Sequence, residues 1–267
     1  MSLTLRSDRA VVSISPDDGG RLSSLQLDGT ELLGHGRPEI GSPLGWYHGL
    51  FPMAPYAGRL KDGRFRFGNL TYRVVPNSGS HAGHGLVFDV PWSTLLASDN
   101  QVALAVNLDE RWPFGGTLMQ SFDLDPSGLS IALQLRNDDR PMPGNLGFHP
   151  WFRRDLGTGP AVISFDPMLR YALAGDSFPR LLSHDLGQRP WDDVFTGLRQ
   201  WPRIAWPEGP TISIHSTADH WIVYERQVDA FCIEPVTGPP DSLGTSRASV
   251  ITPDSPLTLS MRLEWVL

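Results

Sequence analysis

Two residues have the types and surroundings of a proton-transferring pair. His149 lies between an aromatic residue and a proline, and histidine has an unperturbed pKa near 6.5, which suits proton transfer close to neutrality. Glu234 follows the apolar run Phe231–Ile233, where a carboxylate is costly to bury unless it is paired or functional. Partial burial would raise its pKa toward that of a useful base. The pattern favours general acid–base chemistry. The alternatives are a core histidine and an exposed glutamate at a strand that ends at Pro235.

Other polar residues lie among glycines, prolines and aromatic residues. Arg59 follows a glycine and two prolines, so its loop can hold the side chain in place. His81 and His84 have a spacing that suits metal ligands on a helix, but the glycines on either side of His84 argue against a helix. We therefore predict no metal site and interpret His84 as a ligand-binding residue. Asp192 and Asp193 either open a turn or bind hydroxyl groups.

The elements that must position these residues are strands. Apolar side chains alternate over Leu129–Leu135, Leu257–Trp265 and, briefly, Ile212–His215, which predicts strands with one buried face. A Gly-Asn pair between Arg64–Phe67 and Leu70–Val74 predicts a tight hairpin.

Helices are not expected to contribute much. No window of ten or more residues shows apolar side chains at the helical period of 3.6 residues. Prolines are too frequent between about residue 140 and residue 210 for long helices there. We predict an all-β fold, one large antiparallel β-sandwich that forms a single domain over residues 1–267.

Composition excludes several classes of function. The 267 residues carry a net charge of −7 without any block of Lys or Arg, which argues against nucleic acid and anionic lipid as partners. The single cysteine, Cys232, lies in an apolar run and is expected to be a buried, inert thiol. One cysteine cannot form an internal disulfide and cannot build a thiolate zinc site by itself. The first residues lack a signal-peptide pattern and no apolar run approaches about 18 residues, so we expect a cytoplasmic protein.

Taken together, these segments resemble the aldose 1-epimerase (galactose mutarotase-like) family over nearly the whole chain. The motifs that carry the resemblance are, in chain order, Ser15–Leu25, Gly29–Leu33, Pro55–Gly63, the His84-Gly85 pair with Trp92 downstream, Gly147–Phe152, Asp192–Phe195 and Glu234–Thr237. Two positions depart from the family pattern: Gly58 stands where the family usually has Asn, and Trp151 where Tyr is common. These departures concern the choice of substrate more than the chemistry.

The resemblance implies a galactose mutarotase-like β-sandwich and roles for individual residues. It implies that His149 is the general acid and Glu234 the general base, and that Arg59, His84 and Asp192 hold the sugar, with Asp193 as the alternative to Asp192. The reaction opens and recloses a cyclic hemiacetal by two proton transfers, so it requires neither a metal nor another cofactor.

Three alternatives stay open. The substrate could be a phosphorylated or otherwise modified sugar, for which Arg73, Arg153 and Arg154 are candidate cations. The chain could be a sugar-binding module without activity, or a glycoside hydrolase in which Asp192 or Asp241 partners Glu234. The sugar itself and the oligomeric state do not follow from the sequence.

Overall fold

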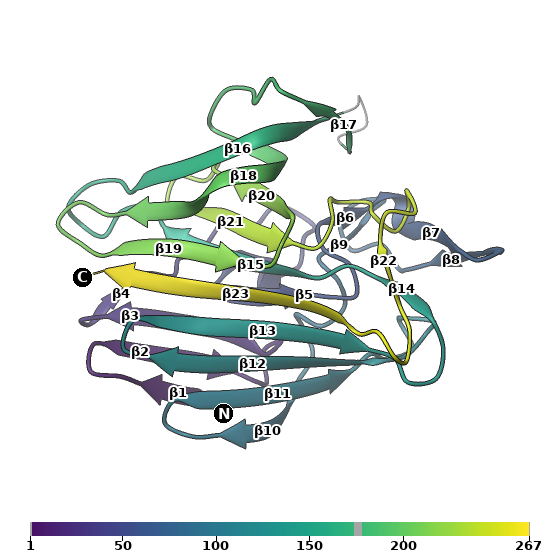
Figure 1. The fold of residues 1–267 in the computed structure, drawn as a ribbon, viewed down its shortest axis with the longest axis horizontal. Coiled ribbons are helices and arrows are strands. Elements are labelled where there is room, and N and C mark those ends of the chain that lie inside the picture. The colour runs from purple at the N-terminus through teal and green to yellow at the C-terminus, as the bar shows by residue number, and fades with distance from the viewer. Residues whose placement is uncertain (1, 174–177, 267) are drawn as a thin grey trace.

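The computed structural model describes residues 2–173 and 178–266, which form antiparallel strands joined into one 17-stranded sheet that folds into two layers (Figure 1). The first layer pairs, in order, β10 (Ser93–Ala97), β11 (Gln101–Asn107), β12 (Thr117–Asp125), β13 (Gly128–Arg136), β23 (Leu257–Val266) and β19 (Thr211–Ser216).

The second layer contains the longer run of strands. It pairs, in order, β1 (Leu3–Arg6), β2 (Ala10–Ser15), β3 (Arg21–Leu27), β5 (Leu50–Met53), β15 (Gly147–Arg153), β21 (Ala230–Val236), β20 (His220–Tyr224), β18 (Asp192–Ala205), β16 (Val162–Leu173) and β17 (Pro179–Ser183), with β4 (Thr30–Glu31) beside β3. The 14-residue β18 pairs with β20 at one end and with β19 at the other, so it connects the two layers.

Short elements complete the chain. Three two-stranded ribbons are formed by β6 (Arg59–Leu60) with β9 (Ala82–Gly83), by β7 (Arg64–Phe67) with β8 (Leu70–Arg73), and by β14 (Met142–Gly144) with β22 (Ser249–Ile251). Helical structure in the described residues is limited to two 3-10 turns, η1 (Leu44–Tyr47) and η2 (Lys61–Gly63). None of the described helices has the length and apolar character needed to cross a bilayer.

The strands predicted from alternation are confirmed. Leu129–Leu135 lies within β13, Leu257–Trp265 within β23, and Ile212–His215 within β19. The Gly-Asn turn joins β7 to β8, with Phe67 opposite Leu70. The all-β prediction and the large antiparallel sandwich are therefore correct, because period-two alternation and turn residues encode this architecture locally.

Two local possibilities raised by the sequence do not hold. Pro235 does not end its strand, since β21 continues to Val236, because the φ angle of proline is compatible with an extended chain. Asp192 and Asp193 do not open a turn, because they are the first residues of β18 and pair with β20.

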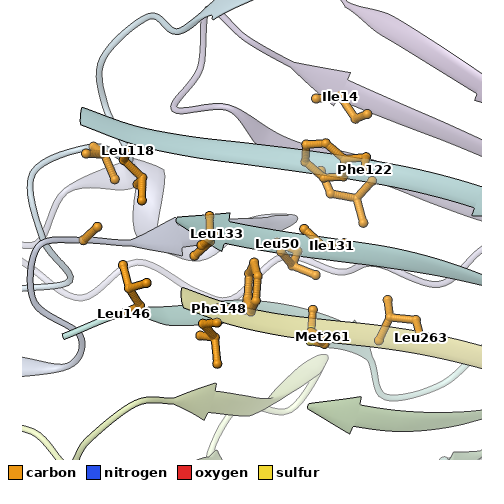
Figure 2. Close-up of a cluster of buried hydrophobic side chains, with 14 of the residues drawn as sticks. Ile14, Leu50, Leu118, Phe122, Ile131, Leu133, Leu146, Phe148, Met261 and Leu263 are labelled. Atoms are coloured by element: carbon orange, nitrogen blue, oxygen red, sulfur yellow. The ribbon is translucent and has the colours of Figure 1, made fainter. Parts of the chain in front are cut away.

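The main core lies between the layers. Figure 2 shows Ile14, Leu50 and Phe148 from the second layer near Phe122, Met261 and other apolar residues of the first, and all are at most 1% exposed. Because side chains alternate along a strand, Phe148 points into this core while His149 and Trp151 lie on the other face of β15. A second apolar cluster covers that face and includes Trp46, Phe51, Trp151 and Cys232, so β15 and β21 are buried on both sides.

Candidate active site

The two predicted proton carriers face each other across two buried strands. The pairing of β15 with β21 sets His149 opposite Glu234, and Nε2 of His149 lies 3.4 Å from Oε1 of Glu234. Neither Pro150 nor Pro235 has an N–H, so backbone pairing is interrupted at this point and resumes on either side. The ring of Phe51, opposite His149 on β5, stacks on the imidazole with centroids 4.7 Å apart. The imidazole is therefore held in one plane beside the carboxylate.

These residues form the floor of a cavity of about 270 Å³. The cavity lining includes all five residues predicted to form the site, Arg59, His84, His149, Asp192 and Glu234. They come from β6, the segment after β9, β15, β18 and β21, so the fold brings together residues that are far apart in the chain.

The sheet register separates the two neighbouring aspartates. Asp192 pairs with Tyr224, which pairs with Cys232, and these positions share the cavity face. Asp193 also borders the cavity, but its Oδ1 lies 3.3 Å from Nη1 of Arg170 on β16. Asp192 is therefore the aspartate whose carboxylate is directed to the cavity.

Asp192 stands at the cavity mouth with 48% of its side chain exposed. The surrounding protein nevertheless raises the pKa of this carboxyl by desolvation, while Arg226 and Arg59 act in the opposite direction. Nη1 of Arg226 lies 3.9 Å from Oδ2 of Asp192. The mouth thus carries both hydrogen-bond acceptors and donors that suit sugar hydroxyl groups.

His84 is held in an unusual backbone conformation. Its φ of 56° is in the left-handed region, which non-glycine residues adopt rarely, and its N–H donates to the carbonyl of Gly58 at 2.8 Å. Nδ1 lies 3.0 Å from the sulfur of Met53, and the ring packs edge-on against Trp46 and His149. Burial, together with the charge of Arg59, lowers the pKa of His84 to about 3. His84 is therefore a neutral hydrogen-bonding group near pH 7.

The local packing explains the glycine that precedes Arg59. Gly58 has a φ of 64°, and a Cβ added there would lie 2.8 Å from the side chain of Pro240. Asn tolerates the left-handed region, but its Cβ would meet the same proline. The backbone of Arg59 is fixed by pairing with Gly83 and by its carbonyl, which accepts the N–H of Asp241 at 2.7 Å.

Burial dominates the protonation of the pair on the cavity floor. His149 is 6% exposed and Glu234 is 2% exposed. Desolvation lowers the pKa of His149 well below its usual value, with a further contribution from His84, and raises the pKa of Glu234 well above its usual value, with a further contribution from Asp192. Burial therefore favours the uncharged form of each group, in which the exchangeable proton of the pair is on Glu234.

The chain is similar to proteins of a known family. The sequence model of the family described as aldose 1-epimerase matches residues 1–159, which include Arg59, His84 and His149. The chain belongs to the aldose 1-epimerase family. Asp192 and Glu234 lie beyond the matched residues.

Individual proteins and solved structures are also similar to this chain. An uncharacterised Escherichia coli protein, YphB, is 26% identical over 94% of this chain and 94% of its own length. An E. coli aldose 1-epimerase is 30% identical over 57% of this chain and 47% of its own length. The crystal structure of a putative aldose 1-epimerase from E. coli has a TM-score of 0.85 at 22% identity, over 100% of this chain and 99% of that one. The sandwich is thus of the galactose mutarotase-like type.

Several residues that border the cavity were not predicted from the sequence. Trp46 and Tyr47 of η1 border the cavity, and the carbonyl of Trp46 accepts the Nε1–H of Trp151 at 2.7 Å. Tyr224 and Arg226 at the end of β20 also border it. Only the aromatic pair between two glycines at Trp46-Tyr47 offered a local signal. Arg226 follows an ordinary strand, and only tertiary structure shows its position.

The candidate cations for a modified sugar were Arg73, Arg153 and Arg154. None of them is among the described residues that line the cavity. Arg154 donates instead to the backbone carbonyls of Glu225 and Gln227. Asp241, a suggested hydrolase partner, is also outside the lining, and its Oδ1 accepts the N–H of Lys61.

Proposed function

We propose that this chain is an aldose 1-epimerase that interconverts the α and β anomers of an aldose. The observation that carries the proposal is the buried pair of His149 and Glu234, 3.4 Å apart on the floor of a sugar-sized cavity. The anomeric hydroxyl and the ring oxygen are both bonded to C1. Two adjacent groups on one floor can therefore reach both oxygens of the same hemiacetal.

Ring opening requires one proton to leave the anomeric hydroxyl and one to reach the ring oxygen. In our proposal the Glu234 carboxylate accepts the first and the His149 imidazolium donates the second. Rotation about the C1–C2 bond then presents the other face of the aldehyde. Reclosure reverses the two transfers and yields the other anomer, with the protein returned to its initial state.

The burial of the pair favours the opening step. Ring opening begins with an ion pair, the Glu234 carboxylate and the His149 imidazolium, and it ends with both groups neutral. Each of these two states of the pair carries one exchangeable proton. Because the pair is buried, its surroundings disfavour the two charges and favour the neutral state. Ring opening thus converts the pair from its charged state to its neutral state, which is the state that desolvation favours.

In the same proposal, three residues hold the sugar over this floor. Arg59 supplies a cationic hydrogen-bond donor, neutral His84 a nitrogen donor or acceptor, and Asp192 an acceptor for hydroxyl groups. Trp46 and Trp151 add aromatic surface, on which the C–H face of a sugar can pack.

Glycoside hydrolysis is less well supported. Hydrolases normally use two carboxyl groups about 5–9.5 Å apart on either side of the scissile bond. The group that lies against Glu234 is an imidazole.

Substitution of the pair tests the assignment. We expect Glu234→Gln and His149→Asn each to lower anomer exchange by about 100-fold or more, with the double variant only slightly worse than the poorer single, because the two groups act as one unit. Exchange is measured by saturation-transfer NMR across a panel of aldoses, with circular dichroism as the check on folding.

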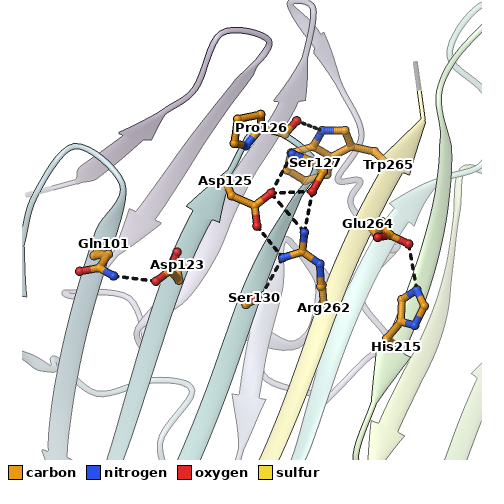
Figure 3. Close-up of polar contacts among 10 residues, drawn as sticks. All are labelled: Gln101, Asp123, Asp125, Pro126, Ser127, Ser130, His215, Arg262, Glu264 and Trp265. Carbon is orange, nitrogen blue, oxygen red and sulfur yellow. Dashed lines mark hydrogen bonds and ion pairs between the residues drawn. The ribbon is translucent and has the colours of Figure 1, made fainter.

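A second His–Glu pair in the same protein supplies the matched control. His215 and Glu264 lie 3.2 Å apart on the exposed face of the first layer, as Figure 3 shows. His215→Asn and Glu264→Gln should leave exchange unchanged. Near-wild-type exchange in a folded Glu234→Gln protein would remove the base assignment and the proposal with it.

A further inference from the structure

A third group that the proposed reaction does not use lies beside the pair, beneath the residues that line the cavity. Cys232 is fully buried two residues before Glu234 on β21, so both side chains lie on the same face of the strand. One ligand-type atom from each of His149, Cys232 and Glu234 lies within 4.8 Å of the other two. A nitrogen, a sulfur and an oxygen therefore form one compact cluster.

The carboxylate in this cluster has free coordination capacity. Glu234 is only 2% exposed, and its buried Oε2 has no hydrogen-bond partner among the described residues. Glu234 also borders the cavity, so the oxygen can be approached from that side. A buried acceptor without a partner is costly and is normally satisfied by a ligand, an ion or water.

The donor set indicates which ion would bind. Zinc is held by imidazole, thiolate and carboxylate at about 2.0–2.3 Å, commonly with three protein ligands and a fourth, open position. Tetrahedral geometry at those lengths places ligand atoms about 3.3–3.8 Å apart. The 3.4 Å between Nε2 of His149 and Oε1 of Glu234 already satisfies one edge of that tetrahedron. Mg²⁺ and Ca²⁺ prefer oxygen ligands and are poorly matched to this set.

We propose that His149, Cys232 and Glu234 form a binding site for a thiophilic divalent cation of the Zn²⁺ class, and that the bound ion inhibits anomer exchange. The ion would enter through the cavity and take its fourth ligand from there. It would occupy the lone pairs with which His149 and Glu234 exchange protons. The inhibition rests on the proposed function, whereas the binding does not.

Cobalt titration tests the binding independently of activity. Tag-free, reduced protein is titrated with Co²⁺ and monitored by absorption, where a tetrahedral thiolate site gives a sulfur-to-cobalt charge-transfer band together with d–d bands. We expect one equivalent of Co²⁺ to produce both, and Zn²⁺ to displace it. The Cys232→Ser protein should lose the charge-transfer band, and the His215→Asn protein, altered at the surface His–Glu pair, should keep it. Absence of the band in the wild-type protein would overturn the site.

Exchange assays test the inhibition. We expect Zn²⁺ to inhibit the wild-type protein, EDTA to restore it, and Cys232→Ser to require at least about tenfold more Zn²⁺ for the same inhibition while its exchange without metal stays near the wild-type rate. Equal sensitivity to Zn²⁺ in wild-type and Cys232→Ser proteins would overturn the proposal.

If Cys232→Ser does not fold, loss of the Co²⁺ bands in Glu234→Gln, retained in Glu264→Gln, decides the site. A protein that binds Co²⁺ in this way but exchanges no aldose would disprove the function and leave the site standing.

Discussion

At the scale of single residues, burial opposes fixed charges on both His149 and Glu234. Burial lowers the pKa of His149 well below its usual value and raises that of Glu234 well above its own. A simple assignment from the sequence would make Glu234 responsible for the acid limb of the rate profile and His149 for the alkaline limb. The directions of both shifts reverse this assignment.

The pH dependence of exchange follows from the one exchangeable proton of this pair. Below the lowered pKa of His149 the pair gains a second proton, and above the raised pKa of Glu234 it loses its last one, so the rate should fall on both sides of a broad plateau. The measurement is kcat/KM against pH for the wild-type protein and Glu234→Gln. In the variant the alkaline limb should move toward lower pH, because the lowered pKa of His149 alone then controls the proton that is donated. An alkaline limb at an unchanged pH in Glu234→Gln would contradict the assignment.

Arg59 and His84 are expected to act through binding and positioning. Each would contribute hydrogen bonds to the sugar, worth about 1.5–3 kcal/mol from the charged Arg59 and about 0.5–1.5 kcal/mol from the neutral His84. Arg59→Ala should therefore weaken sugar binding by roughly 10- to 100-fold and His84→Ala by roughly 3- to 10-fold, and both should lower turnover as well. Sugar affinity by calorimetry and exchange by NMR measure the two effects. Arg64→Ala, at an exposed position on β7, is the control. Normal affinity with complete loss of exchange in either variant would show a primary proton-transfer role.

At the scale of elements, β15 and β21 position the pair because both faces of each strand are buried. Phe148 anchors β15 in the core between the layers while His149 faces the cavity. The two prolines beside the pair remove backbone donors, so side-chain packing has to maintain the local geometry.

Phe148→Ala tests this anchoring. Removal of a fully buried phenylalanine should lower the free energy of unfolding by about 3–5 kcal/mol through lost burial and the cavity left behind. Urea unfolding followed by fluorescence measures it. Leu95→Ala on β10, where the side chain is 56% exposed, should change stability by no more than about 0.5 kcal/mol. Similar small effects in both variants would show that the anchor contributes little.

At the scale of the whole molecule, the proposed reaction uses only the residues gathered at the cavity. The charge that develops on the sugar in the proposed reaction is handled by two paired proton transfers, so no Lewis acid is required. The zinc-class ion inferred above would act against the reaction.

Exchange should therefore survive exhaustive dialysis against EDTA, and it should rise if the isolated protein carries an inhibiting ion. Polarimetry before and after dialysis, with metal content from elemental analysis, gives the answer. Loss of exchange on chelation, restored by one divalent ion, would mean that the metal is part of the reaction.

The sequence by itself determined several of the strands and named the candidate site residues. Alternation over Leu129–Leu135 and Leu257–Trp265, and the Gly-Asn turn after Phe67, predicted elements that the structure contains. These features are local, because the period of a strand and the chemistry of a turn depend on neighbouring residues. The motifs likewise named five residues that now line one cavity.

Only the tertiary structure decided how those residues meet. Whether Asp192 or Asp193 faces the cavity depends on the register of β18 against β20, and a slip of one residue would exchange them. The approach of His149 to Glu234, the place of Arg226 at the mouth, and the meeting of Cys232 with the pair arise from pairing between distant segments. The pKa directions follow from the burial that this pairing creates, because desolvation depends on everything packed around a group and on no single stretch of sequence.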